Sequence, residues 1–587
     1  MNNTSVLVIF GEALPRKQLQ ARRYDVVVAK RPLRQDIENL GFKWVDIDSL
    51  IEPGSIYEAS TLLEELSRLT LPDGTRISKS FVYKGFELWW INYDSLFFFF
   101  CLPYTQNRKL LEYIKEFDDI YVYEPTHRSL FSCYLNAHGR RMFILRKGGI
   151  KSPSFLPFGM LLQILLTVLF IPALALMRRP TLVYTGDKFE KGKDHDFRMR
   201  FIYEALRRKN MPFVEFVRGV ESWKSVLGHA LVRKRPVVYP EAIVFVGRFL
   251  SILLGGHRRA RREFGAHIVA SETDALKRFK LLIATQYLLT AYDDVWVIRI
   301  MKWILPAIGV KVAIIPGASR RSFHTVLACK LNNIPSVGIL HGVASRHYNV
   351  YEFMPGFNGK KSMTLDKYGV WSEWWREYFI QHSSAYTAEQ LYVSGPMRPL
   401  LAKGGSKGES RQQQGRSLQV LFVSEEMAVP QEVLPYLLEL LRHKDLNVTL
   451  KFRPQRDGFE QWLQRHEPKL LDRKELQVVK GSMQDAIENT DVAVGCQSTG
   501  VLEALLQHRV PIYFRTRKWG DYYSLKGYDK QNSFFAETPE ELVKKIRQNR
   551  FVAMDSIRTL RERYFGDPYL NGSEWVVEQA EQVLLSG

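Results

Sequence analysis

The chain of 587 residues is long enough for two or three domains, and its 46% hydrophobic and 25% charged residues are ordinary for a globular protein. Lys and Arg number 83 against 62 Asp and Glu, and the net charge of +21 favours an anionic partner: a phosphate-rich substrate, acidic lipid or nucleic acid. The four cysteines are too far apart for a CxxC or zinc pattern, which excludes that kind of metal site and suits reduced thiols in a cytosolic compartment.

Short apolar runs alternate with helical patterns along most of the chain. The first run, Val6–Phe10, is too short for a signal peptide and lacks a basic leading region, so it predicts a buried strand. Runs of this length between turn residues, with helices between them, predict parallel α/β layers. The predicted strands are 6–10, 25–29, 120–125, 181–186, 312–317, 336–340, 391–395, 418–424, 447–452 and 492–495.

Residues 1–150 have an α/β pattern that contains an unusual aromatic run, Phe86–Phe100. The pattern is consistent with an acceptor- or partner-binding module, and equally with an ordinary core.

An uncharged apolar segment follows at Phe155–Met177, with Lys and Arg on both sides. Its length and composition are sufficient for a membrane span, and basic flanks suit an anionic leaflet. A single span would place two cytosolic-looking halves of the chain in different compartments. We therefore expect a shallow monotopic or re-entrant helix, with a span and a buried inter-domain helix as alternatives.

Acidic residues follow the predicted strand 181–186. Asp187, Asp194 and Asp196 are candidates for a base that deprotonates an acceptor hydroxyl, although Asp194 and Asp196 are also suited to capping a helix. Asp194 and Asp196 have the spacing of a DxD metal motif, but they open a predicted helix in the wrong domain, so we expect no metal site.

Two further segments combine apolar, aromatic and basic residues. Residues 242–263 join an apolar stretch to four arginines, and residues 295–309 interleave Trp296 and Trp303 with basic side chains. This composition is typical of surfaces that bind at a membrane interface, and core helices with solvated arginine faces are the alternative.

A second group of candidates lies between residues 315 and 349. His341 and Gly342 directly follow a buried strand, so the histidine is expected to face a crevice as a general base or as a donor to a developing phosphate charge. Just before them, Ser319, Arg320 and Arg321 occupy another loop between a strand and a helix.

The polar segment 402–416 has no apolar period and predicts a flexible linker, after which a new domain begins with a strand. In that domain Lys451 and Arg453 stand at the carboxyl end of a strand, where open α/β sheets bind ligands. Arg453 is a candidate diphosphate clamp, and an exposed strand-end arginine is the alternative.

The clearest signal is the strand–loop–helix–strand pattern of residues 492–514. Gly495, Ser498, Thr499 and Gly500 form the loop, and Glu503 lies in the first turn of the predicted helix. A helix amino terminus with adjacent hydroxyl groups suits phosphate, and Glu503 is placed to accept hydrogen bonds from ribose. An ordinary helix cap is the alternative interpretation.

Five features occur in a fixed order: His341-Gly342 after a strand, then residues 368–379, 391–399, 450–455 and 498–512. Together they resemble the GT-B branch that contains CDP-glycerol glycerophosphotransferases, capsule Kdo transferases, polysialyltransferase-like enzymes and the related UDP-GlcNAc 2-epimerases. The resemblance covers roughly residues 181–585 and leaves residues 1–150 outside.

The resemblance implies two Rossmann-like domains that face a cleft, with the donor on the C-terminal domain and the acceptor on the other. It assigns the cleft histidine to His341 and implies that Ser498, Thr499 and Glu503 hold phosphate and ribose. Arg453 stands where relatives often have a histidine before proline. Such enzymes commonly need no metal or cofactor, because helix dipoles and basic side chains stabilise the leaving diphosphate. The base remains open between His341 and the aspartates of the 187–196 loop.

We therefore expect an α/β protein of GT-B type that transfers a sugar or a glycerophosphate-type group from a nucleotide-activated donor to a glycan or lipid-linked acceptor. It is expected at the cytoplasmic face of an anionic membrane, peripheral or monotopic, without nucleic acid as a partner. The alternatives are a nucleotide-sugar 2-epimerase and a non-catalytic glycan-assembly protein. The expected divisions are an accessory module, an apolar helix, an acceptor domain, a linker and a donor domain, at residues 1–150, 151–180, 181–401, 402–416 and 417–587.

Overall fold

The computed structural model describes most of the chain. The described residues are 4–145, 158–186, 194–218, 223–233, 235–265, 267–270, 272–317, 319–340, 342, 345–355, 363–397, 417–425, 427–453, 457–567 and 569–586. The expected linker, 402–416, lies outside them.

The N-terminal module is built on a parallel sheet of five strands in the order β3-β2-β1-β6-β7. Its central strands are almost wholly apolar and buried, as expected when helices cover both faces. The strands are β1 (Ser5–Ile9), β2 (Val26–Ala29), β3 (Trp44–Asp46), β6 (Asp119–Tyr123) and β7 (Arg141–Leu145), and the main helices are α3 (Ile56–Arg68), α5 (Leu102–Ile114) and α6 (Arg128–Ala137).

The aromatic run of this module is a core that joins it to the next domain. Trp89 and Phe97 are fully buried, and the Trp89 indole N–H donates to the Ala284 carbonyl, 3.0 Å away, in α13 (Ala275–Thr285). The run therefore packs against the first Rossmann-like domain and is not an exposed binding surface.

The first Rossmann-like domain contains a seven-stranded parallel sheet in the order β10-β9-β8-β11-β12-β13-β14. Its strands are β8 (Thr181–Thr185), β9 (Phe213–Val217), β10 (Val237–Val238), β11 (Val312–Ile314), β12 (Ser336–Ile339), β13 (Lys367–Val370) and β14 (Leu391–Val393). The helices used below are α7 (Phe158–Met177), α8 (Arg200–Arg208), α9 (Trp223–Arg233), α10 (Pro240–Leu253), α11 (Gly256–Phe264), α14 (Ala291–Ala307), α15 (Arg320–Leu331) and α16 (Glu373–His382).

The second Rossmann-like domain has a six-stranded parallel sheet in the order β17-β16-β15-β18-β19-β20. Its strands are β15 (Leu418–Val423), β16 (Leu446–Lys451), β17 (Leu476–Val479), β18 (Val492–Gly495), β19 (Val510–Phe514) and β20 (Phe535–Ala536). Among its helices are α17 (Pro430–Leu441), α18 (Gly458–His466) and α21 (Thr499–Leu502).

The last helix, α24 (Gly572–Ser586), leaves the second domain and packs against the first. Val576, Val577 and Ala580 share one buried cluster with Val183 and Ile339 of the first domain's sheet. Although the sequence assigned residues 417–587 to one domain, the chain ends by crossing back over the other sheet.

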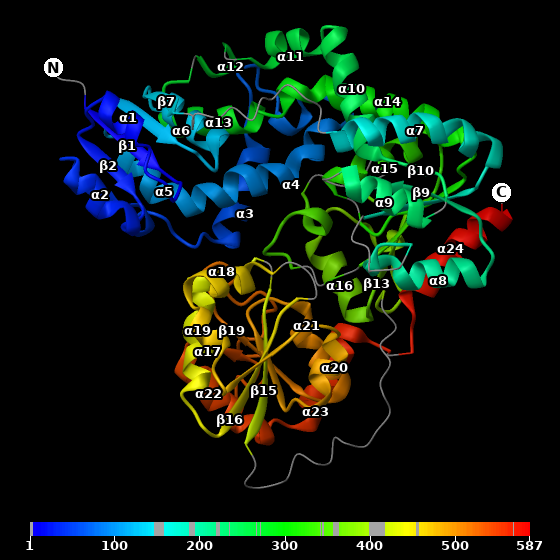
Figure 1. Ribbon diagram of the computed structural model, residues 1–587. Helices are drawn as coiled ribbons and strands as arrows, with labels where there is room; N and C mark the ends of the chain where they lie inside the picture. Colours follow the sequence, from blue (N-terminus) through cyan, green and yellow to red (C-terminus); the bar gives the residue numbers. More distant parts are fainter. Residues whose placement is uncertain are drawn as a thin grey trace.

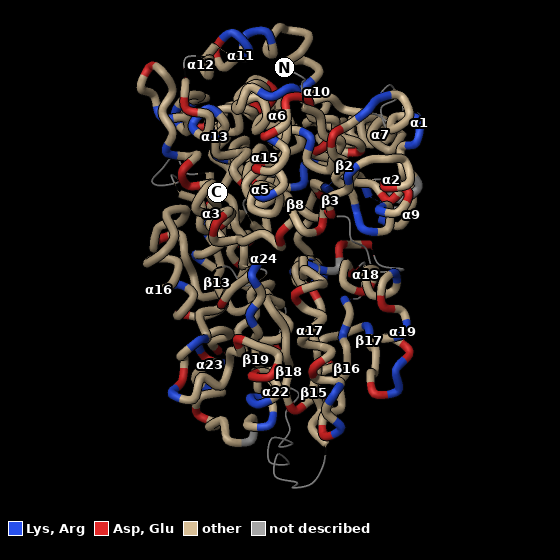
Figure 2. Tube along the Cα trace, turned by 90° about the vertical axis from the view of Figure 1, so that its left-hand side faces the viewer, with Lys and Arg blue, Asp and Glu red and all other residues tan. Residues whose placement is uncertain are grey.

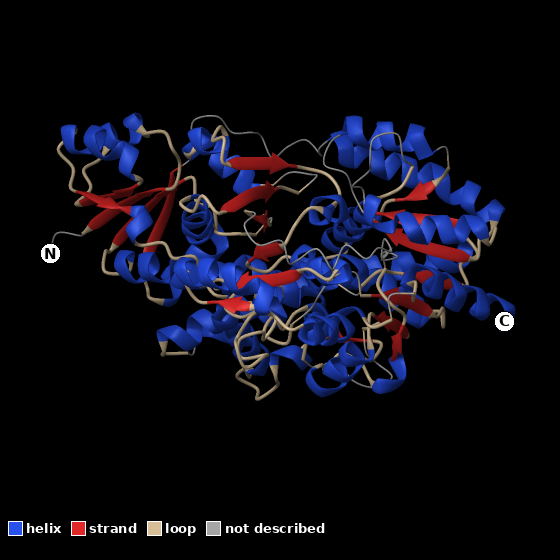
Figure 3. Ribbon diagram, turned by 90° about the horizontal axis from the view of Figure 1, so that it is seen from below, coloured by secondary structure: helices blue, strands red, loops and turns tan. Residues whose placement is uncertain are grey.

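The arrangement follows from these contacts. The N-terminal module and the first Rossmann-like domain lie side by side, with the second Rossmann-like domain below them (Figure 1). The strands form separate groups flanked by helices (Figure 3). Two Rossmann-like domains that face each other confirm the GT-B fold class expected from the sequence.

Candidate functional site

Each Rossmann-like sheet has one place where its strand order reverses. In the first domain it lies between β8 and β11, and in the second between β15 and β18. Connections leave these neighbouring strands in opposite directions, so a crevice opens beyond their carboxyl ends, where ligands bind in open α/β sheets. Side chains that follow these four strands are therefore the first to consider.

The loop after β18 is held firmly. Ser498 accepts a hydrogen bond from the Gly500 N–H at 3.3 Å, and its own carbonyl accepts one from the Tyr513 hydroxyl at 2.9 Å. A side chain at Gly495 would meet Val501 at 2.7 Å, because this loop and helix pack closely. The cap that the sequence analysis gave as the alternative interpretation of Ser498 is present.

The helix after this loop is shorter than expected. α21 has four residues, and a 3-10 helix, η12 (Glu503–Gln507), replaces its continuation up to His508, whose φ of 54° is left-handed. Glu503 thus begins the 3-10 segment instead of lying in the first turn of a long helix. The dipole contribution expected at this loop is correspondingly small.

Lys451 and Glu503 are brought together at the same edge. The Lys451 ammonium donates to the carbonyls of Phe452 and Gly481 at 3.0 and 2.8 Å. Burial lowers the pKa of Lys451, and the negative charge of Glu503 opposes this effect. Two of the candidate donor-binding residues, a cation and a carboxylate, are therefore close enough for their charges to interact.

Arg453 follows β16 and is fixed through its backbone. Its N–H donates to Asp457 at 3.1 Å, and the fully buried Asp457 carboxylate also accepts from the Ser424 hydroxyl at 2.9 Å. Asp457 further caps α18 by accepting from the N–H groups of Phe459 and Glu460. One carboxylate therefore holds the chain segments that follow β15 and β16 together.

Glu425 is a residue that the sequence analysis missed. It lies two residues after β15, is 6% exposed, and neither carboxyl oxygen makes a hydrogen bond of good geometry among the described residues. Burial raises the pKa of Glu425 to about 7, while Lys518 and the Trp519 indole are near enough to oppose the rise. His341 was a candidate because it directly follows a buried strand. The same argument applies to Glu425, which follows β15.

Residues 516–523, the loop that follows β19, cover Glu425. The Lys518 ammonium is buried and donates to the Met427 carbonyl at 2.6 Å, and burial lowers its pKa while Glu425 opposes this. Tyr522 is 4% exposed, burial raises its pKa, and the charges of both Glu352 and Glu425 act on it. Tyr522 is thus near a carboxyl group of each Rossmann-like domain.

Glu352 is the corresponding carboxylate of the first domain, and it was also missed. Its carboxyl accepts from the Tyr368 hydroxyl at 2.8 Å and lies 3.9 Å from where a Cβ at Gly317, just beyond β11, would stand. Burial raises the pKa of Glu352, and the Tyr368 hydrogen bond opposes the rise. Glu352 is 13 residues beyond β12 in the chain, so no local pattern marks it.

The candidate aspartates after β8 are occupied by ion pairs. Asp194 accepts from Arg207 at 2.8 Å and from Arg235 at 2.6 Å; burial acts to raise its pKa, but these hydrogen bonds together with His195 hold it well below its usual range. The fully buried Asp196 caps a 3-10 turn and pairs with Arg198 at 3.1 Å. Both groups fix the loop, and the low pKa makes Asp194 a weak base.

The remaining candidates are only partly described. His341 and Asp187 lie outside the described residues. Ser319, Arg320 and Arg321 begin α15, where the Ser319 N–H donates to Ser322 at 2.9 Å and the two arginine side chains lie outside the description. An added Cβ at Gly342 would meet no atom of the described residues within 4 Å. The described residues contain no group of three or more His, Cys, Asp or Glu that could hold a metal ion.

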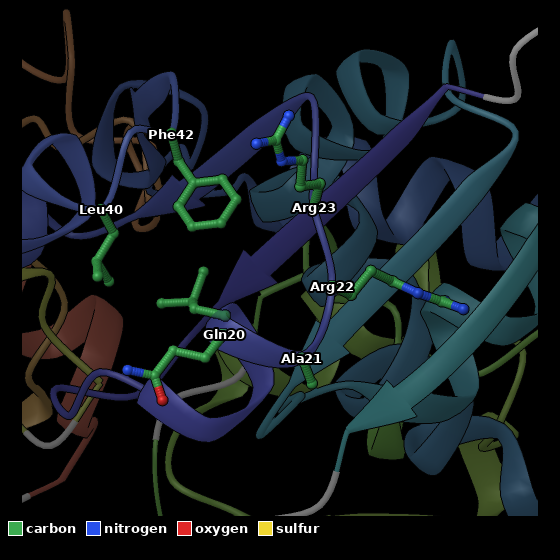
Figure 4. A pocket seen from close by; sticks show the side chains of 7 residues that line it. Gln20, Ala21, Arg22, Arg23, Leu40 and Phe42 are labelled. Atoms are coloured by element: carbon green, nitrogen blue, oxygen red, sulfur yellow. The ribbon is translucent and has the colours of Figure 1, made fainter.

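A surface hollow of about 390 Å³ lies elsewhere, lined by Leu19, Gln20, Arg22, Arg23, Leu40 and Phe42 among others (Figure 4). These residues precede β2 and β3, at the amino ends of the strands. This edge is opposite to the one where parallel sheets bind ligands, so the hollow carries no functional assignment.

No protein-family model and no curated protein sequence matches the chain. Among solved structures it is similar to a Rickettsia africae glycosyltransferase (11% identity, TM-score 0.39), to a Methanocaldococcus jannaschii UDP-GlcNAc 2-epimerase (11%, 0.40) and to an Anabaena protein in complex with UDP and glucose (13%, 0.37). Each match covers 70% of this chain and all of the other. Scores this low assign no family, and the two-domain architecture stands on the sheet topology.

Proposed function

We propose that the protein is a glycosyltransferase that moves a sugar, or a glycerophosphate-type group, from a nucleotide-activated donor to a glycan or lipid-linked acceptor. The observation that carries the proposal is that Lys451, at the end of β16, lies near enough to Glu503 for the two charges to interact, and Glu503 follows the 495–500 loop in the chain. A cation and loop N–H and hydroxyl donors suit the diphosphate, and a carboxylate suits the ribose hydroxyls.

The reaction needs one base and a stabilised leaving group. For a sugar, the acceptor oxygen bonds to the donor's anomeric carbon while the bond from that carbon to the phosphate oxygen breaks. For a glycerophosphate-type group, the acceptor oxygen bonds to phosphorus while the phosphorus–oxygen bond of the diphosphate breaks. In both cases the hydroxyl proton passes to the base and the nucleotide leaves. Glu352 joins His341 as a candidate base of the first domain, because burial brings its pKa closer to neutral pH. Lys451 is a candidate for stabilising the diphosphate charge.

A 2-epimerase is the second candidate, since it would share the donor crevice. Two features favour a transferase: the N-terminal module, and the exposed apolar helices described next. An enzyme that acts on a free nucleotide sugar needs neither of them.

The helix α7 is apolar on the side that faces away from the protein. Gln163 and Thr167 are buried, whereas Val168 and Leu169 are 60% and 58% exposed. Among the described residues it is the one helix long and apolar enough to cross a membrane, and only 17% of its apolar window is buried. A helix in a protein core shows the opposite orientation, so the exposure argues against a buried inter-domain helix.

The neighbouring helices α9 and α10 both contact α7 and have the same orientation. Small residues of α10, Gly247 and Ser251, face the protein, and bulky ones face outward. The exposed apolar side chains are Phe158, Leu161, Leu165, Val168, Leu169 and Leu176 of α7, Trp223, Leu227 and Leu231 of α9, and Val244, Phe249, Ile252 and Leu253 of α10. We call these side chains the apolar face.

Basic side chains lie next to this face. α11 follows α10 directly and carries Arg258, Arg259, Arg261 and Arg262 (Figure 2). Exposed apolar residues beside arginines are the combination that binds an anionic lipid surface. We therefore propose that the protein works as a peripheral or monotopic protein at the cytoplasmic face of a membrane, where a lipid-linked acceptor would be within reach.

The proposed activity is tested by incubating the purified protein with UDP-, CDP-, GDP- and CMP-activated sugars and with CDP-glycerol, and by measuring nucleotide release and the product sugar. Transfer or slow donor hydrolysis releases the nucleotide; epimerisation leaves the donor nucleotide sugar intact with its C2 inverted. The variant Glu352→Gln should lower turnover by about 100-fold or more, as expected for loss of a general base. Exposed Glu373→Gln is the matched control; no release from any donor would contradict the proposal.

A further inference from the structure

The helix α3 of the N-terminal module contacts the first Rossmann-like domain at the segment that follows β12. The Ser60 hydroxyl donates to the His347 carbonyl at 3.0 Å, and the Asn349 side chain donates to the Ser60 carbonyl at 3.0 Å. The rings of Tyr57 and His347 lie 4.8 Å apart. This segment leads directly to Glu352.

The start of the same helix also contacts the second Rossmann-like domain, at loop 516–523. Glu52 pairs with Arg517 at 2.9 Å, and the Ile56 N–H donates to the Lys518 carbonyl at 3.1 Å. Glu52 is paired with Lys109 of its own module as well, at 3.0 Å. The hydrogen bond from Arg517 is the largest cause that lowers the pKa of Glu52.

The approach of helix and loop is close. Gly520 has a φ of +58°, and a Cβ added there would stand 2.8 Å from the Tyr57 ring. Only glycine therefore fits between α3 and the loop. The contact is a packed one and not merely an ion pair across solvent.

Loop 516–523 is also fixed from within its own domain. Glu432, in the first turn of α17, accepts from the Arg517 and Lys518 N–H groups at 2.7 and 3.3 Å. The loop is thus held between Glu432 on one side and α3 on the other. In this position it places Lys518 beside Glu425, and Tyr522 within range of the carboxyl groups of Glu425 and Glu352.

We propose that the N-terminal module is the third part of the catalytic cleft, in which α3 fastens loop 516–523 over Glu425 and Glu352 and Glu52 is the positioning residue. The proposal rests on the proposed function for the chemistry of the cleft, and on the contacts above for the geometry. It gives residues 1–145 a role that no sequence motif indicated.

The titration of Glu425 reports directly on this arrangement. The groups that act on its carboxyl are Lys518 and Trp519 of the loop, Cys496 after β18, and Arg453 after β16. Burial is the largest cause of the raised pKa of Glu425. A loosened loop admits water, so the pKa should fall towards the ordinary value of a glutamate.

The test measures the infrared band of the Glu425 carboxyl, assigned by its loss in Glu425→Gln, as a function of pH in the full-length protein. We expect the midpoint near the wild-type value in Glu38→Gln, which removes an exposed Arg34–Glu38 pair of the same module. In the double variant Glu52→Gln/Arg517→Gln the midpoint should fall by at least one pH unit. The single variant Arg517→Lys keeps the charge opposite Glu52, so its midpoint should stay close to the wild-type value.

An unchanged midpoint in the double variant would overturn the proposal. So would an equal fall in Glu38→Gln, because the effect would then not depend on the contact between module and loop. The measurement needs no nucleotide, so its outcome is independent of whether a donor is found. If the midpoint shifts as expected but no donor binds, the cleft geometry stands and the proposed function fails.

Discussion

At the scale of the residue, the carboxyl groups near the strand ends have two different electrostatic environments. Glu352 and Glu425 lie at the switch points of two facing sheets, and both have pKa values raised by burial. Asp194 has its pKa lowered by ion pairs instead. The first kind of environment is the one that produces acids and bases active near neutral pH.

The raised pKa of Glu425 makes a prediction about stability. Between the ordinary glutamate pKa and about 7, the folded state binds a proton that the unfolded state has lost, so rising pH destabilises the fold. As the pH rises from 5 to 8, the free energy of unfolding of the wild type should therefore fall relative to that of Glu425→Gln, by up to about 3 kcal/mol. Denaturant unfolding of both proteins at each pH measures this difference. Parallel pH profiles of the two proteins would show that Glu425 titrates normally.

Residue-level interpretation works best where one short motif contains the whole interaction, as in the Ser498 cap of Gly500. Glu352 could not be found in this way, because its partner Tyr368 belongs to another strand and only the assembled sheet brings them together. The ion pair of Asp194 with Arg235 could not be seen in the sequence either, because the two residues are 41 positions apart.

At the scale of the element, α7 is oriented opposite to a helix of a protein core. Its composition was evident from the sequence, but its orientation was not, because nothing in the segment shows that Gln163 and Thr167 face inward. α9 was missed entirely, since its exposed stripe, Trp223, Leu227 and Leu231, is too short to be recognised by composition.

The apolar face predicts membrane binding. The wild type should sediment with phosphatidylcholine vesicles that contain about 30% of the anionic lipid phosphatidylglycerol, and less with pure phosphatidylcholine. Leu165→Ser/Val168→Ser should weaken binding several-fold without loss of thermal stability, because both side chains are exposed. Val82→Ser and Tyr569→Ser, at exposed sites outside the apolar face, are the matched controls. Equal binding by all variants would remove α7 from the interface.

At the scale of the whole molecule, the chain order and the spatial order differ. The last helix in the sequence packs against the first Rossmann-like domain, and the first module in the sequence contacts both of the other two domains. Periodicity predicted α/β units along the chain, but the path of α24 depends on a partner surface hundreds of residues away. The sequence pattern of α24 alone would suit either sheet.

Because α24 packs against the first Rossmann-like domain, a substitution in α24 should lower the stability of that domain. Val577 is fully buried against the first domain's sheet, so Val577→Ala should destabilise that domain by about 2–3 kcal/mol. Hydrogen exchange should then increase in β8 and α8 while β15 and β16 keep their protection. Increased exchange confined to the second domain would contradict the assignment. The neighbouring surface variant Glu578→Gln serves as control.

The central claim, a nucleotide-activated donor bound at the β15–β18 crevice, is tested most directly by thermal unfolding of the full-length protein with UDP, CDP, GDP, ADP and CMP, alongside Glu503→Gln. A nucleotide present at 100 times its Kd stabilises the folded state by about 2.7 kcal/mol, which raises the midpoint of a domain of this size by about 5–10 °C. We predict such a shift for one nucleotide class in the wild type and its loss in Glu503→Gln. No shift with any nucleotide, or an equal shift in the variant, would contradict the donor site proposed here.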